Sequence, residues 1–351
     1  MARRLLALLL AVLAISATRR RSVDPVSFPQ IDAIARNALA SGIPALSIAV
    51  MRGDTVVLTG GYGLMNIETR EPAFHDSVYQ IGSITKQFTA AAIMKLVEQG
   101  KLQTSDRLRT YVPELDARFD AVTIEHLLTH TSGIFEYNNL LVTAWQPKSE
   151  AEMLSLIGRR NLLFAPGSNW SYSNSNYYLL GVIIERVSST SYAQFLDENF
   201  FFPLGLTRTS YCREPVPAGY FTDATSTAPV RPADMSLLFA AGAICSTTED
   251  LVRWNRALVQ GLAVAPSSYV RMTTPYRLSN GETVEYGYAL ILDSLDGHSR
   301  AWHGGIVLGF EANLAWYPDR DLAVAVLVNV LDLRYDFASE IADAVARELL
   351  K

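Results

Sequence analysis

The segments that favour β-strands lie near the two ends of this 351-residue chain. Two runs of apolar and β-branched residues follow each other near the start, and two more follow each other near the end. They are residues 45–51, 56–64, 309–317 and 322–329. Between about 80 and 235 the spacing of apolar residues is instead typical of helices joined by long loops. Strands from both ends predict one antiparallel sheet that is interrupted by a helical insertion.

The predicted fold class is therefore α/β of the α+β kind, with an antiparallel sheet flanked by helices and an added all-helical part. Amphipathic patterns predict helices that cover the sheet at residues 28–40, 247–258 and 337–350. We assign residues 24–79 and 236–351 to a sheet domain and residues 80–235 to a helical domain. A chain of this length has ample material for a core.

Ser83 and Lys86 stand three positions apart where a helix is predicted to begin. Apolar residues at the spacing of a helix follow them, and Gly100 is placed to end that helix. Residues three apart share one helix face, so the Lys86 amine can reach the Ser83 hydroxyl. The positive potential of the helix start and partial burial should lower the pKa of Lys86. This pair predicts a nucleophile with its own base, although a serine at a helix start is commonly just a cap.

Tyr172, Ser173 and Asn174 follow a turn signal at 164–167 and precede an apolar helix predicted over 177–187. In an extended loop, Tyr172 and Asn174 would project the same way. A phenol can carry a proton if a nearby ammonium lowers its pKa, and an amide can both donate to and accept from a substrate. Taken alone, the tripeptide is better explained as part of a polar loop over residues 168–176.

His303, Gly304 and Gly305 precede the two C-terminal strands, so we place them on or beside a strand next to that hairpin. Glycines on such a strand allow a substrate backbone to approach closely. The following residue, Ile306, can offer its backbone N–H to an oxyanion. A simple turn with a surface histidine is the alternative.

The order of these three elements resembles the penicillin-recognising serine enzymes, in which Ser-x-x-Lys is followed by a Ser-Asp-Asn-type and then a Lys-Thr-Gly-type motif. With Tyr-x-Asn in the middle, the chain is similar to class C β-lactamases, related esterases and D-stereospecific peptidases. The resemblance spans about residues 28–348. Further matching segments are residues 88–90, 126–134, 166–167, 177–181, 203–206, 241–247 and 250–251.

The resemblance implies acyl transfer in a cleft between the two domains. Ser83 is expected to attack an ester or amide carbonyl while Lys86 and Tyr172 move its proton. The backbone N–H groups of Ser83 and Ile306 are expected to hold the oxyanion. The remaining roles are those of substrate-binding residues: Asn174 and Gly305 orient the substrate, and His303 hydrogen-bonds near Tyr172. No cofactor is predicted, and the predicted partner is a small ester, amide or peptide.

One departure from the β-lactamase pattern concerns the substrate. His303 stands where β-lactamases usually carry a lysine that resembles an anchor for the antibiotic's carboxylate, and histidine is mostly neutral at pH 7. No glutamate comparable to the deacylation base of class A enzymes can be placed. We therefore expect an esterase or D-peptidase. The alternatives are a true β-lactamase or DD-peptidase, and a catalytically silent binding protein of the same fold.

The N-terminus reads as an export signal. A basic start, a short apolar run and small residues at 16–17 predict a signal peptide over residues 1–17, and hence a periplasmic or secreted protein. An uncleaved N-terminal anchor is the alternative, because arginines follow at 19–21. No later segment predicts a stable membrane span. A net charge of −5 gives no basic patch for nucleic acid. The oligomeric state stays open.

Two further pairs of residues need an interpretation. Cys212 and Cys245 can form one disulfide in an oxidising compartment, with two separate buried thiols as the alternative. His126 and His130 stand four apart, as metal ligands on a helix do. No third ligand or His-Glu-x-x-His pattern accompanies them, so no metal site is predicted.

Overall fold

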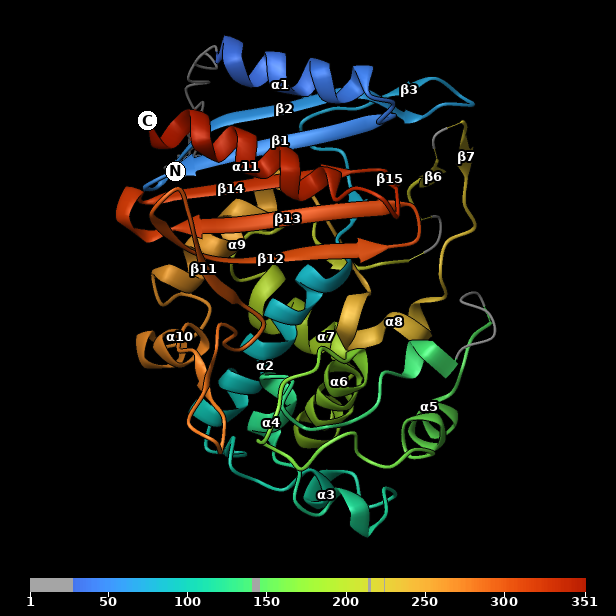
Figure 1. Ribbon diagram of the computed structural model, residues 1–351, viewed down its shortest axis with the longest axis vertical. Helices are drawn as coiled ribbons and strands as arrows, with labels where there is room; N and C mark the ends of the chain where they lie inside the picture. Colours follow the sequence, from blue (N-terminus) through green and yellow to red (C-terminus); the bar gives the residue numbers. More distant parts are fainter. Residues whose placement is uncertain (1–27, 141–145, 214–215, 224) are drawn as a thin grey trace, which may run out of the picture.

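The computed structural model of the chain describes residues 28–140, 146–213, 216–223 and 225–351. Its main element is a seven-stranded sheet in the order β11-β12-β13-β14-β1-β2-β3, in which every neighbouring pair runs antiparallel (Figure 1). The strands are β1 Ala45–Arg52, β2 Thr55–Asn66, β3 Glu71–Pro72, β11 Ile291–Leu295, β12 His298–Val307, β13 Phe310–Tyr317 and β14 Leu322–Val328. Both chain ends contribute strands, so the predicted fold class is confirmed.

The first and last parts of the chain meet at the centre of this sheet, where β1 pairs with β14 from Leu46 opposite Val328 to Arg52 opposite Leu322. Every residue of β14 is buried, because helices cover both faces of the sheet. In Figure 1, α1 and α11 lie across one face and α9 lies against the other. This burial on two sides accounts for the nearly continuous apolar sequence of the central strands.

The described residues contain eleven α-helices. They are α1 Pro29–Ala40, α2 Thr85–Glu98, α3 Leu108–Tyr111, α4 Ile124–Leu128, α5 Glu150–Ile157, α6 Asn174–Ser188, α7 Tyr192–Leu196, α8 Met235–Gly242, α9 Thr248–Val259, α10 Pro266–Met272 and α11 Phe337–Leu350. The three helices predicted to cover the sheet are α1, α9 and α11, each within one residue of its expected start.

Helix α2 forms the centre of the helical part and packs against α6 and α8. Eleven of its fourteen residues are buried, among them four polar or charged ones, so the helix is enclosed on almost every side. At its sheet end the ring of Phe88 stacks on Trp254 of α9, with centroids 4.0 Å apart. This contact joins the helical part to the layer under the sheet. The division into two domains at residues 80 and 235 stays a prediction.

Three short sheets complete the fold. Their strands are β4 Tyr79–Gln80, β8 Ile244–Ser246 and β5 Ser210–Tyr211; β15 Val330–Leu331, β6 Tyr220–Thr222 and β7 Thr227–Pro229; and β9 Tyr276–Arg277 with β10 Thr283–Val284. In the first of them, Cys245 pairs with Gln80 and is joined to Cys212 by a disulfide. The predicted disulfide is present and lies beside strand β4, which leads to Ser83.

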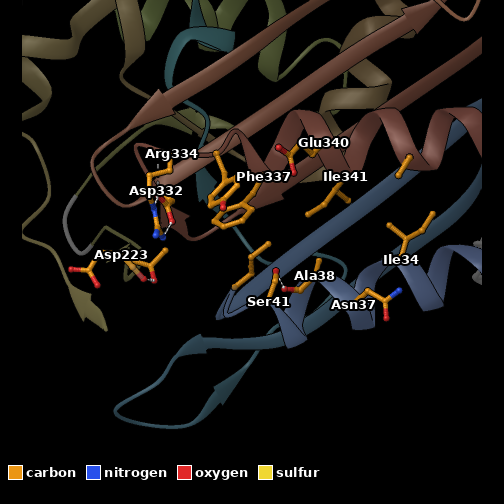
Figure 2. A pocket seen from close by; sticks show the side chains of 14 residues that line it. Ile34, Asn37, Ala38, Ser41, Asp223, Asp332, Arg334, Phe337, Glu340 and Ile341 are labelled. Atoms are coloured by element: carbon orange, nitrogen blue, oxygen red, sulfur yellow. Dashed lines mark hydrogen bonds and ion pairs between the residues drawn. The ribbon is translucent and has the colours of Figure 1, made fainter. Parts of the chain in front are cut away.

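A pocket of about 470 Å³ lies between α1, α11 and the loop after β15, on the face of the sheet away from the helical part (Figure 2). Three of its charged groups have partners. Arg334 pairs with the buried carboxylate of Asp332, and Asp223 accepts hydrogen bonds from Thr225 and Ser226.

No helix of the described residues is long and apolar enough to cross a membrane. The predicted signal peptide, residues 1–17, lies outside the described residues.

Candidate active site

Ser83 lies in a 3-10 turn, Gly82–Ile84, between strand β4 and helix α2. We had expected it within the first turn of the α-helix, which begins two residues later at Thr85. The turn depends on Gly82, which has a φ of +50°. A Cβ atom added at this position would stand 2.8 Å from the Ile306 nitrogen. The predicted contact is nevertheless formed, because Lys86 Nζ lies 2.9 Å from Ser83 Oγ.

The Lys86 amine is completely buried and has three polar neighbours. Two can only accept from it: the Asn174 side-chain oxygen at 2.7 Å and the Ala241 carbonyl at 2.8 Å. The third, the Ser83 hydroxyl, can also donate. A neutral amine has two N–H groups and one lone pair, so it fits these partners with the lone pair facing Ser83.

Burial lowers the pKa of Lys86 from its ordinary 10.5 to about 7, while the charge of Glu136 opposes this shift. We had expected a lower pKa, but from partial burial and the helix terminus. Complete burial is the main cause. A substantial neutral fraction is therefore present at physiological pH.

The Tyr172 hydroxyl lies 2.8 Å from Ser83 Oγ, to which it donates. Desolvation raises the pKa of Tyr172 above its usual value of 10, and its hydrogen bond with Ser83 only partly offsets this. We had reasoned that the neighbouring ammonium would lower this pKa. That reasoning was wrong, because desolvation by burial is the largest influence on this pKa and raises it. Tyr172 is therefore a neutral phenol that can give a proton.

Asn174 is the first residue of α6, three residues earlier than the helix start we predicted. Its side chain is held by Lys86, and its backbone N–H donates to Glu136. Glu136 also accepts the N–H of Asn138 at 3.0 Å. Sequence reasoning missed this carboxylate, because Glu136 stands in a loop with no recognised motif and reaches the site only through tertiary structure.

His303 lies on β12, as predicted, and is buried. Its Nδ1 lies 2.6 Å from the Gly304 carbonyl, which can only accept, so Nδ1 carries the proton. Nε2 consequently accepts from the Tyr286 hydroxyl at 3.0 Å. We had expected a hydrogen bond near Tyr172, but the two rings lie 6.2 Å apart and Tyr286 takes that role. Burial and the charge of Lys86 lower the pKa of His303 to about 4, so the ring is neutral at pH 7.

Strand β12 lies directly against the turn that carries Ser83. A Cβ atom on Gly305 would stand 2.0 Å from the Ile81 carbonyl oxygen and 3.2 Å from the Ser83 nitrogen. On the neighbouring Gly304 it would meet nothing closer than 3.7 Å. Gly305 is thus required for close approach, and the backbone nitrogens of Ser83 and Ile306 lie in the same small region.

The two histidines spaced like metal ligands have separate roles. His126 belongs to the cap of α4, where its Nδ1 accepts the N–H of Thr123 at 3.2 Å. His130 lies beyond the end of that helix and contacts Tyr172. The described residues include no group of three or more histidine, cysteine, aspartate or glutamate side chains arranged to hold a metal.

Similarity to known proteins identifies the family of this chain. Residues 31–347 match the family described as Beta-lactamase. Penicillin-binding protein 4* of Bacillus subtilis is 30% identical over 306 residues, which cover 81% of this chain. The chain spans 67% of that relative's length, and 56% to 64% of the next two curated relatives.

Two solved structures are also similar. An octameric penicillin-binding protein homologue from Pyrococcus abyssi is 30% identical with a TM-score of 0.80, covering 92% of this chain and 77% of its own. A D-stereospecific amidohydrolase from Streptomyces is 25% identical with a TM-score of 0.76, covering 92% and 98%. The family match extends over nine-tenths of the sequence. This chain therefore belongs to the beta-lactamase family of hydrolases.

Proposed function

We propose that this protein is a serine hydrolase that cleaves amide or ester bonds through an acyl-enzyme on Ser83. One observation carries the proposal: Ser83 Oγ lies 2.9 Å from a buried amine with a lowered pKa and 2.8 Å from a neutral phenol. A base and an acid thus meet at one hydroxyl. This is the arrangement that an activated nucleophile needs.

In the acylation step, Ser83 Oγ attacks the substrate carbonyl carbon and gives its proton to the neutral amine of Lys86. The N–H groups of Ser83 and Ile306 stabilise the oxyanion that forms. As the bond to the leaving group breaks, the leaving nitrogen or oxygen takes the proton of the Tyr172 hydroxyl. The proton on Lys86 then restores the phenol, which leaves the amine neutral again.

Hydrolysis of the acyl-enzyme uses the same groups in a second round. The water oxygen attacks the acyl carbon while Lys86 takes a proton from that water, and Ser83 Oγ leaves with a proton supplied by Tyr172. Transfer of the Lys86 proton to the phenolate then restores the neutral amine and the neutral phenol. Both half-reactions therefore need a neutral amine and a neutral phenol. Proton transfers of this kind contribute about 10²- to 10⁴-fold to rate.

The charges at the site favour substrates without a carboxylate beside the reacting bond. His303 is neutral, so it can make only an ordinary hydrogen bond to a carboxylate. Glu136 adds a negative charge nearby. The similar Streptomyces enzyme is a D-stereospecific amidohydrolase, which supports small amides as substrates. We propose short esters and amino-acid amides, with D-amino-acid amides among them, ahead of β-lactams and DD-peptides.

Labelling tests the proposal directly. A fluorophosphonate should modify Ser83 stoichiometrically, and Ser83→Ala should lose both labelling and turnover while remaining folded. Peptide mapping that finds the label on another residue would refute the assignment of the nucleophile. Absence of any label on folded protein would favour a silent binding protein.

A substrate panel separates the remaining alternatives. It should contain p-nitrophenyl acetate, both enantiomers of an amino-acid amide, and a chromogenic cephalosporin. We expect esters and amides to show the higher kcat/KM. A cephalosporin turned over faster than every ester and amide would instead indicate a true β-lactamase.

Export through residues 1–17, and the position of the site between two domains, remain part of this proposal.

A further inference from the structure

His130 contacts three consecutive residues of the segment that carries Tyr172. Its carbonyl accepts the N–H of Ser171 at 3.0 Å, and its Nδ1 accepts the N–H of Ser173 at 3.2 Å. Between these two bonds, its ring packs on the ring of Tyr172, with centroids 4.3 Å apart and planes inclined by 36°. One residue therefore fixes the backbone on both sides of Tyr172 and the plane of its ring.

The orientation of the His130 ring is itself fixed. Nδ1 also accepts from the Asn176 side-chain nitrogen at 3.1 Å, so Nδ1 carries no proton. Asn176 cannot turn over freely, because its oxygen accepts from the Ser132 hydroxyl at 2.6 Å. The Ser132 oxygen in turn accepts the N–H of Ile134 at 3.0 Å. A chain of hydrogen bonds thus sets the tautomer and the direction of the imidazole.

This arrangement is unfavourable for His130 considered alone. Its φ of +58° lies in the left-handed region, which a side chain other than glycine adopts at a cost. With Nδ1 accepting, the proton is on Nε2, and Nε2 is buried without a hydrogen-bond partner among the described residues. The rings of Tyr177 and Tyr286 pack beside the imidazole, each with its centroid 5.1 Å from the centroid of the His130 ring. Strain and an unsatisfied donor at one residue are typical of functional sites.

We propose that His130 is a positioning residue that holds the Tyr172 hydroxyl on Ser83. This inference rests on the proposed function, in which that hydroxyl supplies the proton to the leaving group. Tyr172 precedes the first residue of α6 by two positions, so the helix does not fix it. The contacts of His130 with residues 171–173 instead fix the position of the Tyr172 side chain.

The test uses His130→Asn, which keeps an acceptor near the place of Nδ1 and tolerates a positive φ but removes the ring. We expect kcat to fall about 10- to 100-fold, within the range of a displaced proton donor, while KM changes less than about threefold. His126→Asn is the matched control, because His126 caps α4 and should leave kcat unchanged. An unchanged kcat in His130→Asn would overturn the inference.

A double-mutant cycle distinguishes positioning from a purely structural role. If His130 acts through Tyr172, the pair His130→Asn with Tyr172→Phe should be no more than about threefold slower than Tyr172→Phe alone. Effects that multiply would refute the inference. If Tyr172→Phe by itself loses less than about threefold in kcat, the proposed function fails first. Should His130→Asn not fold, Asn176→Ala removes the side-chain hydrogen bond to Nδ1 of His130 and should show the same non-additivity with Tyr172→Phe.

Discussion

Replacing Glu136 by glutamine should move the acid limb of the pH–rate profile to lower pH. The proposed mechanism needs the neutral amine of Lys86, so kcat/KM should rise with pH through a midpoint near 7, the pKa of that amine. Glu136 raises this pKa by stabilising the charged form. The N–H groups of Asn174 and Asn138 bond to different oxygens of Glu136, so glutamine removes the charge and keeps an acceptor for one of the two.

The size of the shift follows from the position of the carboxylate. Asn174 lies between Glu136 and Lys86, because it bonds to both. For charges on the order of 8 Å apart and an effective dielectric constant of about 20–40, the interaction is about 1–2 kcal/mol, or roughly one pH unit. With a pKa of about 7, roughly a tenth of the amine is neutral at pH 6. A pKa one unit lower makes about half of it neutral, so kcat/KM at pH 6, relative to its plateau, should rise roughly fivefold.

The assay is hydrolysis of p-nitrophenyl acetate from pH 5 to 9 at constant ionic strength, with kcat/KM normalised to its plateau. Glu71→Gln is the control, because Glu71 is exposed on the edge strand β3, and its profile should match the wild type. An acid limb that stays within about 0.2 pH units in Glu136→Gln, or moves to higher pH, would show that Glu136 does not control the charge of Lys86.

Three other predictions test the packing. Gly305→Ala should lose at least about tenfold in kcat/KM because its Cβ would collide with the backbone at the Ser83 turn, whereas Gly304→Ala should be nearly neutral. Non-reducing mass spectrometry should find Cys212 bonded to Cys245, and reduction should cost roughly 3–4 kcal/mol of stability, seen as a lower Tm; two free thiols in active protein would contradict this. Between pH 7 and 10.5 the Lys86 amine holds its proton in the unfolded chain but not in the folded one, so folding stability from this group rises with pH. From pH 7 to 9 the free energy of unfolding of the wild type should therefore increase by about 2 kcal/mol relative to that of Lys86→Met. A difference in urea midpoint between the two proteins that is the same at both pH values would contradict this prediction.

The sequence alone determined the features that depend on local spacing. The strands at both ends were recognisable because their apolar runs and turn residues are contiguous. Ser83 and Lys86 could be paired because three positions along a helical turn bring two side chains together. The order of the three short motifs indicated the family. The placement of His303 on a strand beside the C-terminal hairpin was also correct.

Only the tertiary structure decided how these groups behave chemically. Lys86 meets Asn174 and Ala241 across 88 and 155 positions of sequence, and complete burial lowers the pKa of its amine. Burial likewise keeps Tyr172 protonated, against our expectation from charge alone. Glu136 and His130 act on residues about 40 positions away, so no local pattern could assign them. A pKa depends on everything that surrounds a group in space, and a sequence specifies directly only the neighbours along the chain.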